Sequence, residues 1–299
     1  MLRRRLLLVF LPSLLCNFAV SQANLRGGPL LDCSGLPCVE VTLASGKHLR
    51  LLIDTGNVAS VLDKAVATDM RLETTPVMGS DGKPVVAYSR AVLPGVKIGD
   101  AFLGDVRILV MDLSDDIKRD RMPVSDGTLA YTAFKDRILE LDYRRKTVRI
   151  SEALHDPVSC PVFCGKLTTP TFGKKGPPIL VATGFSINRH LITAQIDTLF
   201  SGTMLIYPTS VDKLGLMDAA KTTNKDFFKY TDDGVEMLKT IGPTESFGPR
   251  ILAKDAPLYF ATPEVHLPNG MFDGTVGHAL FEHSVLTLDL HDMKVWMAE

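Results

Sequence analysis

The chain has little excess charge of either sign and lacks two common catalytic signatures. Of its 299 residues, 22% are charged, and the formal net charge is −1. With no block of like charges, nothing in the sequence indicates binding to nucleic acid or to an anionic membrane surface. A Gly-x-Ser-x-Gly elbow and a Gly-Lys-Ser/Thr phosphate loop are both missing, so serine hydrolases and P-loop enzymes are excluded as starting hypotheses.

Long apolar runs are also missing, apart from one at the N-terminus. The opening stretch MLRRRLLLVFLPSLLCNFAVSQA joins a basic start to about 15 apolar residues and ends in small residues at Ser21 and Ala23. The run is short for a bilayer, which needs about 20 residues, and Pro12 interrupts it. A lipoprotein site at Cys16 is disfavoured by the bulky Leu15 before it. We predict a cleaved signal peptide over residues 1–23, a secreted or periplasmic protein, and no stable membrane anchor.

Cysteines are few, but those left after the predicted cleavage are even in number, as in exported proteins with disulfides. They form two close pairs, Cys33 with Cys38 and Cys160 with Cys164. Local pairing is the simplest of the three possible connectivities, and spacing alone leaves the other two open. The predicted export favours disulfides over a metal site at these cysteines. His278 and His283 are five apart rather than four, which favours structural histidines. We therefore predict structural disulfides and neither metal nor cofactor.

The most informative property of the chain is an internal repeat. The block DGTLAYTAFKDRILELDYRRKTVRI from Asp126 resembles DGTVGHALFEHSVLTLDLHDMKVWM from Asp273 without a gap. These two aspartates are 147 residues apart, and the Asp-Thr pairs that begin at Asp54 and Asp197 are 143 apart, so the two comparisons agree within one short insertion. Between them, GSDGKPV and TDDGVEM both resemble a hairpin turn. One unit therefore occurs twice in the same order.

The periodicity within each unit is mainly that of β-strands, and helical signals are limited to 63–70 and 208–216. Asp63 fits a helix N-cap better than a catalytic group. The segment 151–178 is rich in Pro, Gly, Thr and Cys and indicates a boundary. We predict a mostly β fold of two similar β-barrel-like lobes, residues 24–155 and residues 156–299, with a cleft between them.

Each unit supplies one carboxylate at the end of an apolar strand, and this is what a paired acid/base site requires. Two aspartates brought together share one proton, because ionising both is costly. The ionised one can take a proton from a water that attacks a peptide carbonyl, and the protonated one can protonate the leaving nitrogen. We predict Asp54 and Asp197 as the catalytic pair. Thr55 and Thr198 would join the two loops, and Gly56 would leave room beside the carboxylate.

At these residues the sequence resembles the aspartic proteases, in particular the bacterial retropepsin-like and pepsin-like forms. LLIDTGNVASVLD is similar to the Asp-Thr-Gly loop of that family, and DGTLA and DGTVG fall at its later supporting motif. GSDGKPVVAYS stands where the family has its flap, which implies substrate contacts for Gly79, Asp81, Gly82 and Tyr88. The resemblance implies two β-barrel-like lobes with one catalytic aspartate each.

Two positions depart from the motif, and both concern glycine. Leu199 stands where the first copy has Gly56, and Ala130 stands where the second copy has Gly277. A positive φ at Leu199 would cost about 1–3 kcal/mol. If the site needs only room, Leu199 would instead crowd the water or the substrate.

The sequence thus leaves two hypotheses of different class. The first is an exported, monomeric aspartic endopeptidase whose partner is a peptide or protein substrate. The second is a non-catalytic homologue that binds peptides or a partner protein in the cleft. Pairing of the first lobe with that of another molecule is less favoured, because the second lobe is present in the same chain.

Overall fold

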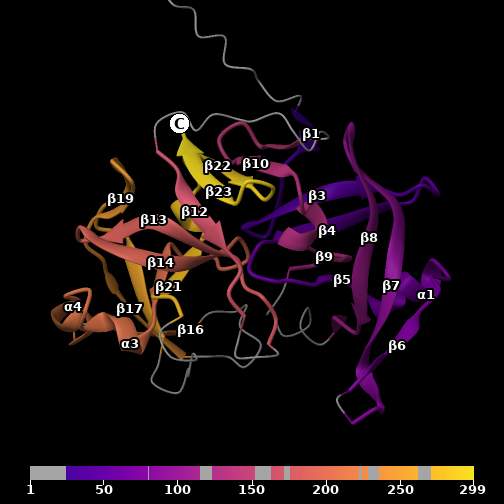
Figure 1. The fold of residues 1–299 in the computed structure, drawn as a ribbon, viewed down its shortest axis with the longest axis horizontal. Coiled ribbons are helices and arrows are strands. Elements are labelled where there is room, and N and C mark those ends of the chain that lie inside the picture. Colours follow the sequence, from indigo (N-terminus) through magenta and orange to yellow (C-terminus); the bar gives the residue numbers. More distant parts are fainter. Residues whose placement is uncertain are drawn as a thin grey trace, which may run out of the picture.

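The computed structural model describes residues 25–79, 81–114, 123–151, 163–171, 176–221, 224–227, 236–261 and 271–299. The predicted signal peptide and Cys160 lie outside these residues. Strands dominate the described residues, and helices are few and short (Figure 1). The predicted mostly β, two-lobed fold is confirmed. None of the described helices is long and apolar enough to cross a membrane.

The N-terminal lobe is built on one sheet, with the strand order β2-β3-β4-β9-β5-β8-β7-β6. Its strands are β2 (Leu31–Cys33), β3 (Leu36–Thr42), β4 (His48–Asp54), β5 (Ser60–Asp63), β6 (Thr75–Met78), β7 (Pro84–Ile98), β8 (Ala101–Met111) and β9 (Gly127–Ala130). In β4 the side chains alternate between exposed and buried from His48 to Leu51, after which all are buried through Asp54. This change follows from the pairing of β4 with β3 on one side and β9 on the other.

The C-terminal lobe carries the equivalent strands. They are β12 (Gly165–Thr168), β13 (Val181–Ile187), β14 (His190–Asp197), β15 (Met204–Ile206), β16 (Asn224–Phe227), β17 (Glu236–Ile241), β18 (Glu245–Phe247), β19 (Arg250–Ala253), β20 (Pro257–Ala261) and β21 (Gly274–Gly277). The pair β4–β9 in the first lobe and the pair β14–β21 in the second are both parallel. Each aspartate thus ends a strand that runs alongside an Asp-Gly-Thr strand.

The terminal strands of the two units join in a single sheet. They are β1 (Leu25–Pro29), β10 (Ile138–Asp142), β11 (Thr147–Ser151), β22 (Val285–Asp289) and β23 (Lys294–Ala298). Strand β10 pairs with β22 across the two lobes, and the order β1-β11-β10-β22-β23-β12 continues into the second lobe. Figure 1 shows yellow β22 and β23 next to β10, with the first lobe at the right and the second at the left. The boundary between residues 155 and 156 remains a prediction. Strands from before it and strands from after it lie together in this sheet.

The repeat in the sequence is a repeat in the structure. In the first unit, β9 is followed by the 3-10 turn η1 (Tyr131–Phe134), β10 and β11; in the second, β21 is followed by η2 (His278–Leu280), β22 and β23. Asp126 Oδ2 accepts a hydrogen bond from Arg50 N at 2.7 Å, and Asp273 Oδ2 accepts one from Thr193 N at 2.9 Å. Equivalent aspartates therefore tie together equivalent strand pairs in the two lobes, β4 with β9 and β14 with β21.

Hydrophobic packing is continuous across the shared sheet. Leu139 and Leu141 on β10 belong to the same buried cluster as Leu286 and Leu288 on β22. The cluster extends from there into both lobes. Because burying apolar area is the main favourable contribution to folding, this seam resists displacement of one lobe against the other.

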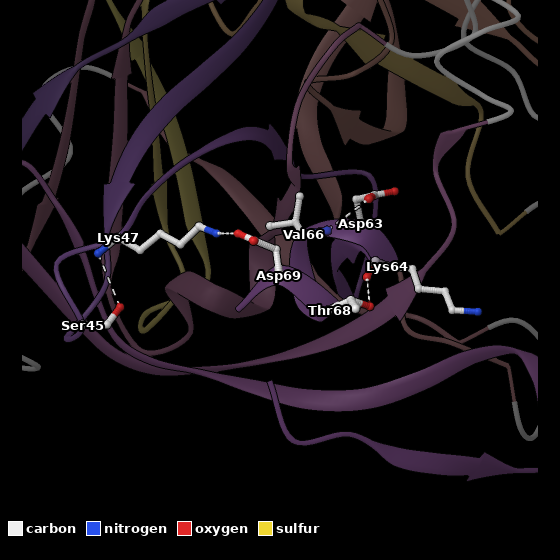
Figure 2. A network of polar contacts seen from close by, with 7 residues as sticks. All are labelled: Ser45, Lys47, Asp63, Lys64, Val66, Thr68 and Asp69. Carbon is white, nitrogen blue, oxygen red and sulfur yellow. Dashed lines mark hydrogen bonds and ion pairs between the residues drawn. The ribbon is translucent and has the colours of Figure 1, made fainter. Parts of the chain in front are cut away.

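Short helices cap the lobes where the sequence predicts them. Helix α1 (Lys64–Asp69) begins after Asp63, whose Oδ1 accepts hydrogen bonds from Ala65 N at 2.8 Å and Val66 N at 3.4 Å. Figure 2 shows this cap and the ion pair between Lys47 and Asp69 at the other end. Asp63 is therefore the predicted N-cap.

In the second lobe, α3 (Pro208–Val211) begins with Pro208 as predicted but is shorter than the expected 208–216. Its missing last turn is replaced by non-helical turns and a separate helix, α4 (Met217–Lys221). Gly215, with a φ of +64°, stands between them and ends the helical path.

Candidate active site

The two predicted catalytic aspartates end equivalent strands. Asp54 is the last residue of β4 and pairs with Ala130, and Asp197 is the last residue of β14 and pairs with Gly277. Asp54 is 4% exposed, and Asp197 is partly buried. Both carboxylates thus emerge from the centre of their sheets, one from each lobe.

Two buried threonines join the loops that follow these strands. Thr55 N donates to Thr198 Oγ1, and Thr198 N donates to Thr55 Oγ1, both at 3.1 Å. Each hydroxyl also donates to the backbone of the other lobe, Thr55 to Ile196 O and Thr198 to Ile53 O. The predicted role of the threonines as a link between the loops agrees with this geometry. Because both residues are inaccessible to solvent, the link is not weakened by competing water.

The link brings the Asp54 loop against the Asp197 carboxylate. A Cβ atom placed on Gly56 would stand 2.6 Å from Asp197 Oδ2, far inside van der Waals contact. Gly56 does not have a positive φ, so glycine is needed there for space and not for a left-handed backbone. Gln195 Nε2 donates to Gly56 O at 2.8 Å and adds a further hydrogen bond between the lobes at this loop.

Burial and mutual repulsion perturb both carboxyl groups. Burial and, to a smaller extent, the nearby charge of Asp197 raise the pKa of Asp54 to about 7, although hydrogen bonds from Asn57 and Gly56 oppose the rise. Burial also raises the pKa of Asp197, against the backbone N–H groups of Leu199 and Phe200. Groups coupled in this way lose their protons in steps that belong to the pair. Near neutral pH, the pair therefore favours holding one proton.

Asn57 is a site residue that the sequence analysis missed. Its Nδ2 donates to Asp54 Oδ2 at 3.0 Å. The corresponding residue in the second loop is Phe200, which offers Asp197 only its backbone N–H, at 3.3 Å from Oδ1. The available signal was the Asp-Thr-Gly-Asn sequence, in which a short amide three residues after an aspartate can reach back to the carboxylate.

The structure corrects the first of the two expectations stated for Leu199. It does not have a positive φ, so no left-handed strain arises. Its side chain packs against the apolar cluster of Cys33, Leu36, Cys38 and Leu52, together with Leu31. Its N–H donates to Asp197 Oδ1 at 2.9 Å. The loop formed by the Cys33–Cys38 disulfide therefore provides the space that the missing glycine would otherwise have left.

Ala130, the second departure from the repeated motif, is accommodated in its sheet for a different reason. At the equivalent Gly277, an added Cβ would overlap the carbonyl oxygens of Gly202 and Phe200. Ala130 is fully buried, and its N–H donates to the Ser60 hydroxyl at 3.0 Å, whereas Gly277 N donates to the backbone oxygen of Thr203 at 2.8 Å. A side-chain acceptor in one lobe replaces a backbone acceptor in the other.

The predicted flap is a hairpin formed by β6 and β7. Gly79 N donates to Lys83 O at 2.7 Å, Asp81 Oδ1 accepts from Lys83 N at 3.0 Å, and Gly82 has a φ of +75°. Tyr88 lies on β7, 37% exposed, beside a groove of about 670 Å³ between α1 and the hairpin. The equivalent strands in the second lobe, β16 and β17, also pair, and the tip at 228–235 lies outside the described residues.

The disulfide prediction is confirmed for the first pair, since Cys33 and Cys38 are bonded to each other. Cys164 is also disulfide-bonded, and its predicted partner Cys160 lies outside the described residues. The described part of the chain contains no group of three or more His, Cys, Asp or Glu side chains arranged to hold a metal ion.

Comparisons with known proteins bear mainly on the first lobe. Residues 39–133 match the aspartyl protease family. This segment contains the Asp54 loop and the β6–β7 hairpin and ends before Asp197, and it supports an aspartic-protease-like family. Among solved structures, the chain is similar to conglutin gamma, a unique basic 7S globulin from lupine seeds, with 12% identity and a TM-score of 0.49 over 93% of this chain and 95% of that chain. No curated protein matches the chain.

Proposed function

We propose that the protein is an exported aspartic endopeptidase in which Asp54 and Asp197 form one catalytic pair. The observation that carries this proposal is the reciprocal hydrogen bonding of Thr55 and Thr198, which holds two buried carboxylates at one point between the lobes. The match of the first lobe to the aspartyl proteases supports the same class of chemistry. Because one chain supplies both lobes, a pepsin-like arrangement is favoured over a dimer of single lobes.

The chemistry follows from a pair that holds one proton. The ionised carboxylate takes a proton from a water held between the two groups, and the oxygen of that water attacks the peptide carbonyl carbon. The protonated carboxyl donates a hydrogen bond to the developing oxyanion and then gives its proton to the leaving nitrogen as the C–N bond breaks. The raised pKa values suit this division, because one proton stays on the pair in water of mildly acidic to neutral pH.

The surroundings of the pair are assigned supporting roles. Thr55 and Thr198 hold the loops together, Gly56 leaves space beside Asp197, and Asn57 orients Asp54. We assign Gly79, Asp81, Gly82 and Tyr88 to a flap that covers a peptide lying in the predicted cleft. The signal-like residues 1–23 support export to a secreted or periplasmic location, where the Cys33–Cys38 disulfide is stable. We expect a monomer whose partner is its peptide or protein substrate.

The alternative of a non-catalytic binding protein rested on Leu199. Its side chain packs against the disulfide loop, and this contact favours the endopeptidase. The binding protein therefore becomes an outcome of the test and not a second proposal.

The test is cleavage of a diverse peptide mixture by the mature chain, from Asn24 onward with disulfides intact, between about pH 3 and about pH 7. Products are read by mass spectrometry for the wild type, Asp54→Asn and Asp197→Asn. These isosteric changes keep the packing while removing one titrating group each, and each should lower cleavage by about 100-fold or more. Cleavage that survives Asp197→Asn would contradict the intramolecular pair. A folded wild type that cuts nothing at any pH would favour the binding protein.

A further inference from the structure

A second hollow lies at the junction of three segments that the proposed reaction does not use directly. It has a volume of about 550 Å³ and is lined by the disulfide loop, the turn after β10 and the residues after β21. We call it the His278 pocket. Small-molecule sites in proteins are typically about 300–1,000 Å³, so a ligand of modest size would fit.

Two buried side chains in its wall have unsatisfied polar atoms. Tyr143 is 6% exposed and His278 is 8% exposed, and their ring centroids are 6.4 Å apart. The Tyr143 hydroxyl and His278 Nδ1 have no hydrogen-bond partner among the described residues. Such groups normally cost about 1–3 kcal/mol each, so folded proteins rarely leave them unpaired without a reason. Neither group belongs to the proposed catalytic pair.

Charges of both signs surround these two groups. Arg144 and Lys146 come from the turn after β10, Asp32 from the disulfide loop and Glu282 from the segment after η2. Burial lowers the pKa of His278, and the charge of Lys146 adds to this effect, whereas the charges of Glu282 and Asp32 and the backbone oxygen of Phe200 oppose it. The imidazole is therefore neutral at pH 7 and can accept or donate at Nδ1, depending on its tautomer. Leu36 adds apolar surface to the pocket.

We propose that the His278 pocket binds a small zwitterion with an apolar side chain, either a free amino acid or a short peptide. The ligand carboxylate would lie against Arg144 and Lys146, with the Tyr143 hydroxyl as a further donor. The ligand ammonium would lie against Glu282 and Asp32. Its side chain would contact Leu36, and this combination of two charges beside an apolar wall distinguishes such a ligand from a simple anion.

The pocket is physically connected to the Asp197 loop at two points. Leu36 belongs to the cluster on which Leu199 packs. His278 N donates to Phe200 O at 3.0 Å. A ligand that shifts Leu36 or His278 therefore acts on both residues whose N–H groups hold Asp197. An effect of the ligand on peptide cleavage rests on the proposed function. Binding of the ligand to the pocket does not.

Calorimetric titration of the disulfide-intact protein tests the binding. The probes are L-leucine and the dipeptide Leu-Leu, with N-acetylleucine and leucinamide as forms that each lack one charge. At least one of the two zwitterions should bind at a single site, and the blocked forms should bind about tenfold more weakly. Binding of leucine alone identifies a free amino acid as the ligand, and binding of Leu-Leu alone identifies a peptide. Absence of saturable binding by both up to about 20 mM would overturn the proposal.

Variants localise that binding to this pocket. Tyr143→Phe removes only the unpaired hydroxyl, so the unliganded protein should melt at the same or a higher temperature while binding weakens about tenfold. Arg144→Ala should also weaken binding, and Arg107→Ala, an exposed arginine on β8, serves as the matched control and should not. Binding that is unchanged in both Tyr143→Phe and Arg144→Ala would place the ligand elsewhere and overturn the assignment.

Discussion

The two aspartate loops share their hydrogen bonds but differ in the residues around them. In both, an aspartate ends a buried strand and is followed by a threonine that bonds to the opposite loop. The first loop then continues with Gly56 and Asn57, and the second continues with Leu199 and Phe200. Backbone N–H groups of the next two loop residues serve both aspartates, and Asp54 alone also receives a side-chain amide, that of Asn57.

This difference shows what the glycine of the motif does here. At Gly56, any side chain would run into Asp197, because the loop of the first lobe approaches that carboxylate directly. At Leu199, the side chain packs on the disulfide loop of the other lobe. The requirement is thus one of space, and it can be met by a glycine or by redirecting a side chain onto a neighbouring apolar surface.

The largest effect is expected from Gly56→Ala. Its methyl group would overlap the Asp197 carboxylate and push the two loops apart, so kcat/KM should fall by about 100-fold or more. Overpacking should also lower the free energy of unfolding by about 1–3 kcal/mol. Leu199→Ala, at the equivalent position, is the matched variant and should retain most activity. Equal losses in the two variants would show that the loops are not as different as their contacts indicate.

Restoring the motif with Leu199→Gly should harm the enzyme. The change removes the contacts of Leu199 with the disulfide loop and adds backbone freedom, which together cost about 2 kcal/mol of stability. We expect kcat/KM to drop by about threefold to tenfold, because the backbone N–H of residue 199, which donates to Asp197, is then held less firmly. A several-fold gain in kcat/KM would instead mean that Leu199 obstructs the site.

The disulfide loop should matter through Leu199. Replacing both Cys33 and Cys38 by serine should cost about 2 kcal/mol, as expected for a short closed loop, and should lower kcat/KM. Serine substitution is preferable to a reducing agent, which would also cut the disulfide of Cys164. Leu199→Ala should then cost at least about 0.5 kcal/mol less in this background than in the wild type. Fully additive losses would argue against the contact.

The smallest effect is expected from Asn57→Ala. The Asn57 amide stabilises ionised Asp54, so its removal raises the pKa of Asp54 further. The alkaline limb of the kcat/KM profile should move to higher pH, while the maximum changes by less than about tenfold. Asn57→Asp would give no such clean comparison because it adds a charge. If the alkaline limb of the kcat/KM profile lies at the same pH in Asn57→Ala and in the wild type, ionisation of Asp54 does not determine that limb.

The sequence revealed the parts of the site that are repeated along the chain. The duplicated blocks predicted the two strands that end in Asp54 and Asp197, and local spacing predicted the Cys33–Cys38 disulfide. Periodicity could not predict that β10 pairs with β22, because a strand pattern identifies a strand and not its partner.

The direction of Leu199 was equally beyond the reach of local pattern. It depends on Leu36 and Cys38, which lie far away in the sequence and approach only after the lobes dock. Asn57 was overlooked because a short polar residue in a loop is common, and its bond to Asp54 becomes evident only from the fold of the turn. The features missed are those that require two distant segments or one specific turn geometry.

The central claim is that the two carboxylates form one electrostatically coupled pair, and a carboxyl titration tests it most directly. Asp54 can be followed by NMR in protein labelled with carbon-13 at the aspartate carboxyl groups, with Asp54→Asn used for assignment. In the wild type its pKa should be about 7. In Asp197→Asn it should fall, because the repelling charge is gone, yet stay above its ordinary value, because burial is the larger cause. An Asp54 pKa that is the same in both proteins would contradict the pair.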